Sequence, residues 1–161
     1  MKILFFLLVA ANIVIDIASY FVLPETVATH FVGNGIPNGW FSANGSLAFN
    51  LGLHGFFLFV IYSMSVALQK TPKALINIPN KEYWIAERNF PLFLMRWEFA
   101  VFQLGCALMI FFMSISFVIL DANFSNPVHM NTTASLAALI GFMLFMFYWL
   151  ASLIRNFRLP E

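Results

Sequence analysis

Charged side chains are scarce in this sequence. Its 161 residues include eight Lys or Arg and seven Asp or Glu, so 9% are charged, whereas 61% are hydrophobic. The mean hydropathy is +0.86. Soluble domains contain about 25% charged residues. So few charges cannot cover a surface that faces water, which excludes a soluble domain. The net charge of +1 gives no basis for binding nucleic acid.

Cysteine is nearly absent as well. Cys106 is the single cysteine, and it lies inside an apolar run. An intramolecular disulfide is therefore excluded, and cysteine usage does not indicate a redox compartment. The sequence also has no Cys-x-x-Cys motif and no paired His inside an apolar run. We therefore expect no haem, no iron–sulfur cluster and no other cofactor.

Long apolar runs are what the sequence has in abundance. Each has about 20 residues, which lets a helix cross a hydrocarbon core of about 30 Å. A helix also satisfies its own backbone hydrogen bonds in lipid. The sequence therefore predicts an all-α fold, in which one domain of residues 1–161 forms a four-helix transmembrane bundle. The predicted spans are Ile3–Val22, Leu47–Leu68, Phe99–Leu120 and Ala134–Ile154.

The start of the first run has a second interpretation. Lys2 followed by a short apolar core and small residues at Ala10 and Ala11 resembles a signal peptide. The apolar run continues to Val22, however, so we favour a retained helix.

Lys and Arg are absent from residues 3–69 and from residues 97–154. Loops that contain Lys and Arg stay in the cytoplasm. Both termini and the middle loop are therefore predicted to lie inside, whereas loops Leu23–Ser46 and Asp121–Thr133 face outward. Aromatic residues, which favour headgroup level, agree with this orientation: Tyr20 and Trp40 at the outer boundary, and Trp84, Trp97, Tyr148 and Trp149 at the inner one.

The first outer loop is rich in turn residues. Asn34-Gly35 and Asn38-Gly39 are turn dipeptides, and Pro37 suits the first central position of a turn that continues with Asn38 and Gly39. Glycines at 33, 35 and 39 permit positive φ. We expect a folded outer loop, with Trp40 pressed into the membrane interface. Composition alone favours a connector over a ligand site, although loops often carry function.

The inner loop predicts a short interfacial helix. Pro79-Asn80 is a turn, and Asn80 is expected to cap a helix that extends to Arg88. Its mixed apolar and charged residues suit the inner leaflet, where nearby lysines would attract anionic headgroups. Arg96 is expected to reach lipid phosphates.

Polar residues inside the spans indicate the candidate site. Asn12 and Asp16 lie one turn apart in the first span, and Asn50 and His54 form a similar pair in the second. Asp16 lies about 9 Å and His54 about 10 Å below the outer helix ends, so the two side chains share a depth. A carboxylate at this depth should face the bundle. We therefore predict an Asp16–His54 pair that is open to the outer side, with His30 and His129 near it.

Four interpretations of this cluster compete. The first is a structural hydrogen bond between helices, and the second is a proton-responsive switch. The third is a zinc site with Asp16 or Asp121 and the three histidines, and the fourth is part of an enzyme active site. No short ligand spacing supports a metal, and no Ser or Cys nucleophile motif stands beside the cluster. We expect no bound metal and no enzymatic activity. The candidate ligand-binding or proton-responsive residues are Asn12, Asp16, His30, Trp40, Asn50 and His54.

Two segments resemble a bacterial membrane-protein family of unknown function that is related to the immunity proteins against the sporulation-delaying toxin. The first is LPETVATHFVGNGIPNGW at residues 23–40, and the second is NIPNKEYWIAERN at residues 77–89. Relatives often carry a Lys soon after the aromatic residue, where this chain has Ser42, Ala43 and Asn44. The positions that match the first signature are Leu23, Pro24, His30, Phe31, Gly35, Pro37, Gly39 and Trp40.

Together these features predict a non-enzymatic, multi-pass protein of the bacterial cytoplasmic (inner) membrane, of immunity or sensor type, that recognises a ligand at its outer face. One alternative is an accessory subunit packed against a larger membrane-protein complex. Another is a small proton-linked transporter, which four short spans suit only if the chain oligomerises. The expected partners are the lipid bilayer and a membrane-protein complex or a second copy of the chain, and no nucleic acid.

Overall fold

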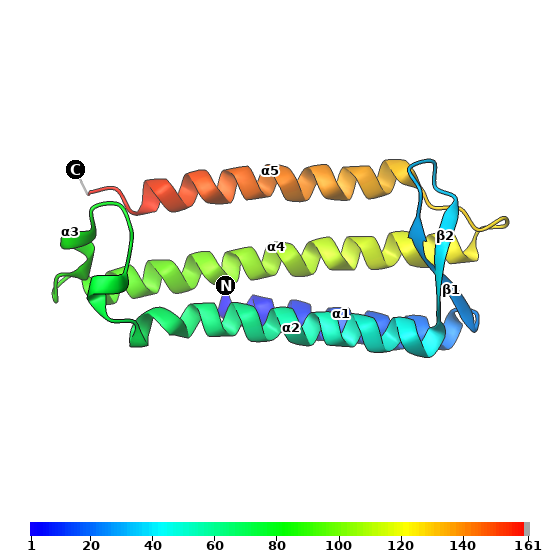
Figure 1. Ribbon diagram of the computed structural model, residues 1–161, viewed down its shortest axis with the longest axis horizontal. Helices are drawn as coiled ribbons and strands as arrows, with labels where there is room; N and C mark the ends of the chain where they lie inside the picture. The colour runs from blue at the N-terminus through cyan, green and yellow to red at the C-terminus, as the bar shows by residue number, and fades with distance from the viewer. Residues whose placement is uncertain (160–161) are drawn as a thin grey trace.

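The computed structural model describes residues 1–159 and consists of long, nearly parallel or antiparallel helices with a small hairpin at one end (Figure 1). Within these residues, four helices are long and apolar enough to span a membrane: α1 (Lys2–Val22), α2 (Ala43–Lys70), α4 (Phe90–Phe124) and α5 (Thr132–Asn156). Strands β1 (Thr26–Phe31) and β2 (Pro37–Ser42) connect α1 to α2. The short helices η1 (Lys73–Leu75) and α3 (Lys81–Ile85) connect α2 to α4.

The predicted four-helix fold of a multi-pass membrane protein is confirmed, but the helices extend beyond the predicted spans. The largest difference is α4, whose 35 residues reach about 52 Å, against about 30 Å of hydrocarbon. The hydropathy of the sequence predicted only the apolar middle of this helix, because the flanking residues are less apolar. The helix begins at Phe90 because Pro91 suits a first turn, where its missing N–H is not needed. It therefore projects beyond the hydrocarbon region.

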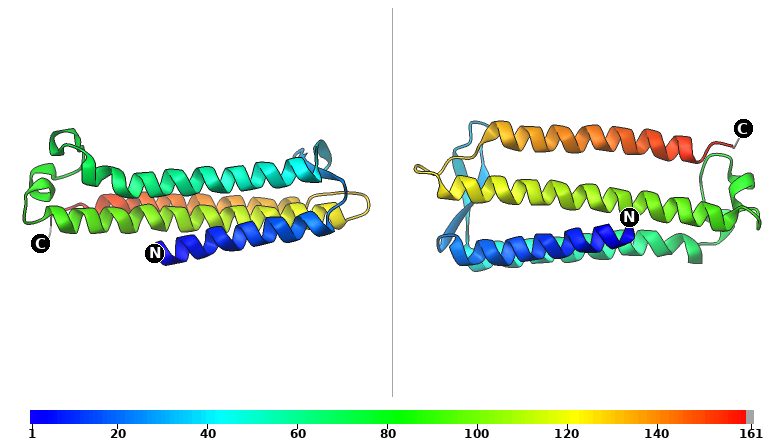
Figure 2. Two further views of the ribbon diagram at one scale, coloured as in Figure 1. Left: turned by 90° about the horizontal axis from the view of Figure 1, so that it is seen from below. Right: turned by 180° about the vertical axis from the view of Figure 1, so that it is seen from behind.

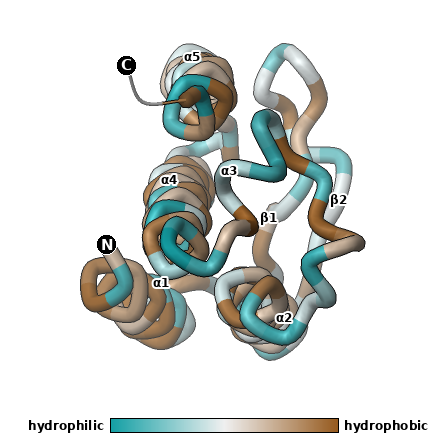
Figure 3. The backbone as a smooth tube through the Cα atoms, turned by 90° about the vertical axis from the view of Figure 1, so that its left-hand side faces the viewer, coloured by the Kyte–Doolittle hydropathy of each residue, from teal (hydrophilic) through white to brown (hydrophobic). Residues whose placement is uncertain are grey.

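Helix α4 is the centre of the bundle. It packs against α1, α2 and α5, and α1 also packs against α2. Seen end-on, α2 and α5 lie on different sides of α4, and the hairpin passes across the end of the bundle between them (Figure 3). The N-terminus lies partway along the bundle, away from the hairpin (Figure 2), and α5 ends on the side where α3 lies (Figure 1). We call the two ends the hairpin end and the termini end.

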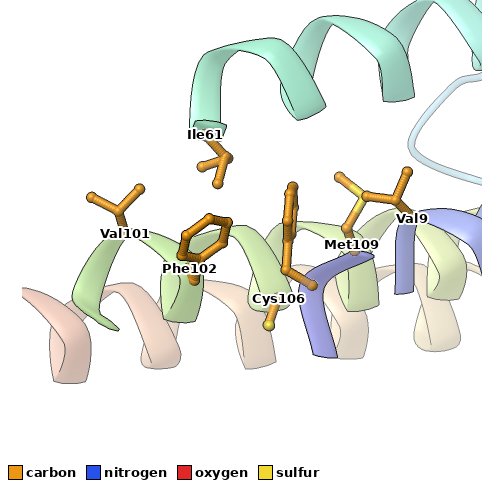
Figure 4. Close-up of a cluster of buried hydrophobic side chains, with 7 residues drawn as sticks. Val9, Ile61, Val101, Phe102, Cys106 and Met109 are labelled. Carbon is orange, nitrogen blue, oxygen red and sulfur yellow. The ribbon is translucent and has the colours of Figure 1, made fainter. Parts of the chain in front are cut away.

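The larger of the two buried apolar clusters in the described chain lies between α1, α2 and α4 (Figure 4). Gly105 of α4 lets the helices approach closely, because a Cβ there would come within 2.8 Å of the Phe5 ring and 3.0 Å of Ile61. In lipid, such close contact is what holds helices together. The buried members of this core are Phe5, Val9, Ile61, Val101, Phe102, Cys106 and Met109.

The segment between α2 and α4 folds onto the ends of α4 and α5. Trp84 is fully buried, and its Nε1 donates a hydrogen bond to the Phe157 carbonyl at 2.9 Å. Arg96 donates to the Asn156 carbonyl and lies over the Trp84 ring, with 4.9 Å from Cζ to the ring centroid. Trp84 is thus not a headgroup anchor, whereas the contact of Arg96 with lipid phosphates stays a prediction.

The predicted extent of the inner helix is also wrong. Helix α3 ends at Ile85 rather than at Arg88. Asn80 adopts a left-handed conformation (φ 54°) and makes no side-chain cap; its Nδ2 instead donates to the Phe157 carbonyl at 3.1 Å. The side-chain amide of Asn80 therefore binds a carbonyl near the end of the chain. The local sequence could not reveal this partner.

The outer loop is an antiparallel hairpin rather than an irregular connector. β1 pairs with β2, with Thr26 opposite Ser42 and Phe31 opposite Pro37. The turn lies at residues 32–36, where the Gly35 amide donates to the Val32 carbonyl at 2.8 Å. Gly35 has φ +84°, which favours glycine. The predicted turn at Pro37-Asn38-Gly39 is therefore wrong, since these residues belong to β2.

Candidate functional site

A cavity of about 630 Å³ lies at the hairpin end, between α1, α2 and α4 and beneath the hairpin. The three helices bring apolar and aromatic side chains to its wall, and both strands contribute to its roof. The volume falls in the range of about 300–1,000 Å³ that is usual for small-molecule sites. Its helical wall includes Tyr20, Phe49, Leu53, Phe111, Phe112, Ile115, Ser116 and Ile119.

Asp16 and His54 lie at this cavity and contact each other. The antiparallel packing of α1 and α2 places Asp16 Oδ2 2.9 Å from His54 Nε2. Their side chains are 3% and 2% exposed, so water screens the contact little. The predicted proximity of the two residues is therefore confirmed, because the rise per residue had already placed them at one depth. The function predicted for the pair stays a prediction.

The hydrogen-bonding capacity of this pair is largely unused. Oδ2 and both ring nitrogens are buried and make no aligned hydrogen bond, so the 2.9 Å contact is a close approach of polar atoms in poor orientation. Asp16 Oδ1 accepts a long hydrogen bond from Asn50 Nδ2 at 3.3 Å. The Phe112 ring lies edge-on to His54, with 5.9 Å between centroids. Buried polar atoms normally have partners, so the lack of aligned partners here calls for an explanation.

His30 and Trp40 lie on the hairpin side of the same cavity. His30 is exposed, and its Nδ1 contacts Asn38 Oδ1 on the neighbouring strand. Trp40 is 47% exposed. The backbone at this point is tight, since a Cβ on Gly39 would come within 2.8 Å of His30 Cβ. The structure thus brings together five of the six predicted site residues.

Asn12 is the sixth, and it lies outside the cavity lining. Its Nδ2 donates to the Leu8 carbonyl at 2.8 Å and to the Met109 carbonyl at 3.1 Å. The second bond joins α1 to α4. Asn12 shares a helix face with Asp16, but the two face different neighbours, and this depends on which helix lies beside each turn.

His129 also lies away from the cavity. Its ring packs beside Gly35 at the hairpin turn, and the Met130 amide donates to the Gly35 carbonyl at 2.9 Å. The expectation that His129 lies near the Asp16–His54 pair is therefore wrong. Within residues 1–159, no group of three or more His, Cys, Asp or Glu side chains is arranged to hold a metal ion.

Asn123 is the positioning residue that the sequence analysis missed. Its Oδ1 accepts from the Ala28 amide at 2.8 Å, and its Nδ2 donates to the Ala28 carbonyl at 2.9 Å. This clamp fixes β1, and with it the roof of the cavity, to the end of α4. The available signal was a lone Asn at the outer end of an apolar run, just beyond the predicted span.

The comparison with protein families matches one domain to part of the chain. Residues 7–52 are similar to a domain of unknown function, DUF1648. The match spans most of α1, the hairpin and the first turns of α2, and it includes Asp16, His30, Trp40 and Asn50. No curated protein and no solved structure matches the chain. A link to toxin immunity proteins therefore stays a prediction.

Proposed function

We propose that this multi-pass membrane protein recognises a ligand in the hairpin-end cavity and acts without catalysis, as an immunity or sensor protein of the bacterial cytoplasmic membrane. The observation that carries the proposal is the buried Asp16–His54 contact at the cavity, with polar atoms that lack aligned partners. Ionisable residues at membrane depth are costly and tend to be functional. The cavity is also large enough for a small molecule or for a side chain of a peptide.

The distribution of cations supports an outward-facing hairpin. Lys2, the basic middle loop and the basic C-terminal residues all belong to the termini end, whereas residues 3–69 have no Lys or Arg. The positive-inside rule then orients the cavity toward the outer side. A ligand would reach it without crossing the bilayer, which suits recognition of an external molecule.

Filling the cavity tests the proposal. Ser116 of α4 lines the cavity, so Ser116→Trp should occupy its space and prevent ligand retention. Phe117→Trp adds an indole on the adjacent, 52% exposed face and is the control. Both variants and the unaltered protein are purified from native membranes, and co-purifying small molecules are compared by mass spectrometry. A molecule retained by the unaltered protein and Phe117→Trp, but lost from Ser116→Trp, is expected.

The same variants test the biological role. A deletion strain is challenged with secreted toxins or competitor supernatants and complemented with each variant. Growth is expected to be rescued by Phe117→Trp and not by Ser116→Trp at equal protein abundance. Equal rescue and equal ligand retention by both variants would contradict recognition through this cavity.

One observation favours a second candidate, an accessory subunit. The most apolar window of α5 has no buried residues, and α5 packs mainly against α4. Its apolar surface is therefore available to lipid or to a partner protein. Purification from native membranes that recovers one larger complex in a fixed ratio, unchanged in Ser116→Trp, would support the subunit role instead.

A further inference from the structure

The charges around the hairpin-end cavity have one sign. Of the cavity-lining residues in the described part of the chain, none is Lys or Arg, and Asp16 is the one acidic residue. The basic residue of α1, Lys2, lies at the other end of the helix, where its Nζ is 3.4 Å from Glu98. The other titratable groups that line the cavity are Tyr20, His30 and His54. The lining thus contains one carboxyl group and no ammonium or guanidinium group.

The cavity wall is mainly apolar, so the electrostatic interactions of a carboxylate there are stronger than in water. The wall is formed mainly by aliphatic and aromatic side chains from α1, α2 and α4. The Coulomb energy between two charges varies inversely with the effective dielectric constant, so a buried carboxylate acts over several ångströms more strongly than one at a surface. The carboxylate therefore need not touch a ligand in order to select its charge.

Aromatic rings surround the same space. Tyr20, Trp40 and Phe41 lie toward the hairpin, and Phe49, Phe111 and Phe112 lie along α2 and α4. The face of an aromatic ring attracts a cation, and the attraction grows when water is excluded. A ring face does not attract an anion in this way. Apolar rings also bury the body of a hydrophobic ligand.

We propose that the hairpin-end cavity selects a lipophilic organic cation, meaning a positively charged centre carried by an apolar body. This proposal rests on the proposed function, since it names the ligand class of the same cavity. The apolar body fills the 630 Å³ space between α2 and α4, and the cationic centre lies among the rings within the field of Asp16. Anions with an equally apolar body are rejected because no basic side chain in the described lining compensates their charge.

A pair of ions with the same shape and opposite charge tests the proposal. Tetraphenylphosphonium and tetraphenylborate are titrated into the purified, full-length protein in nanodiscs. Empty nanodiscs of the same lipid correct for partitioning. Saturable binding of tetraphenylphosphonium is expected, at least about tenfold tighter than that of tetraphenylborate.

Three variants assign the preference to its cause. Asp16→Asn should reduce the ratio of the two affinities by about tenfold, because the amide keeps the shape and removes the charge. Ser116→Trp should weaken both ions, whereas Phe117→Trp should change neither. Each variant is first shown to be folded by an unchanged elution profile and helical circular dichroism signal. If Asp16→Asn fails this criterion, Asp16→Ser is used instead, and it should reduce the ratio of the two affinities in the same way, because it also removes the charge.

The outcomes separate this inference from the proposed function. Binding of both ions that Ser116→Trp abolishes, but without preference for the cation, would overturn the inference and leave recognition by the cavity standing. A cation preference that persists in Asp16→Asn would also overturn it. If neither ion binds saturably, the inference fails, and the ligand-retention experiment with Ser116→Trp alone decides the proposed function.

Discussion

Asp16 is an acidic residue that is buried within a membrane-spanning helix, where a charge is unfavourable. An acidic residue costs about 2.5–3.5 kcal/mol at the centre of a transmembrane helix on insertion scales, which is an upper value for Asp16 because it lies nearer one end of α1. Hydrogen bonds between helices in membranes contribute on average about 0.6 kcal/mol. The long bond from Asn50 and the unaligned contact with His54 therefore do not offset the cost. This imbalance supports the proposed role of Asp16 in recognition.

Asp16→Asn is predicted to keep or raise stability while removing ligand retention. The amide no longer carries the cost of a buried charge, so the free energy of unfolding should stay unchanged or rise by about 1–2 kcal/mol. The thermal midpoint in detergent should then stay unchanged or rise as well. Asn12→Ala is the contrasting variant. It removes the bond to the Met109 carbonyl, so about 1 kcal/mol of stability should be lost while ligand retention is kept. A large loss of stability in Asp16→Asn would favour the structural interpretation.

Gly39 permits the close contact between the strands beside His30. A Cβ at this position would lie 2.8 Å from His30 Cβ, so Gly39→Ala forces the strands apart. We predict that the hairpin loses about 1–3 kcal/mol of stability, the usual range for overpacking. Faster amide hydrogen exchange in residues 26–42 would register the change. Gly33→Ala is the matched control, because nothing lies within 4 Å of its added Cβ, and it should exchange as the unaltered protein does.

At the scale of elements, the hairpin is held in place by two contacts that come from distant parts of the chain. Asn123 at the end of α4 binds both backbone groups of Ala28, and the Met130 amide binds the Gly35 carbonyl beyond it. An isolated two-stranded hairpin is only marginally stable in water. The shape of the cavity roof therefore depends on α4 and on the segment that leads into α5.

Asn123→Ala is predicted to release β1 from α4. Two buried backbone groups of Ala28 then lose their partners, which should cost about 1–3 kcal/mol. Hydrogen exchange at the Ala28 amide should accelerate, and ligand retention should weaken with it. Asn131→Ala removes the cap on the Ala134 amide at the start of α5 and should leave exchange at Ala28 unaltered. Equal protection of Ala28 in both variants would show that the clamp is not needed.

At the scale of the whole molecule, packing and polarity are divided between the two ends. The close-packed core of α1, α2 and α4 lies toward the termini, and the cavity lies toward the hairpin. Interiors transmit strain because they are densely packed. The close-packed half thus adjoins the half that contains the cavity, and α5 leaves most of its apolar surface to lipid or to a partner.

Labelling of single cysteines tests the predicted orientation. In a Cys106→Ala background, Gly33→Cys in the hairpin turn and Ala74→Cys in η1 both introduce an exposed thiol. A membrane-impermeant maleimide should label Gly33→Cys in intact cells, and Ala74→Cys only after permeabilisation, because Lys and Arg keep their loops inside. The reverse pattern would place the cavity on the cytoplasmic side and would contradict recognition of an external ligand.

Local properties were predictable from the sequence. Hydropathy predicted the four spans, since burial in lipid depends on each residue's own transfer energy. The rise per residue predicted that Asp16 and His54 would meet, since depth along a helix needs no knowledge of its neighbours. Helix ends were less well predicted, because α4 continues through charged residues at both sides of its apolar middle.

Only the tertiary structure decided which side chains share a space. Asn12 and Asp16 lie on one helix face, yet the first binds α4 and the second meets α2. Trp84 is buried by the C-terminal segment instead of lying among headgroups, and Asn123 clamps a strand 95 residues away in the chain. The cavity follows from these pairings. The physical reason is that a cavity is enclosed by elements distant in sequence, whose neighbours no local pattern specifies.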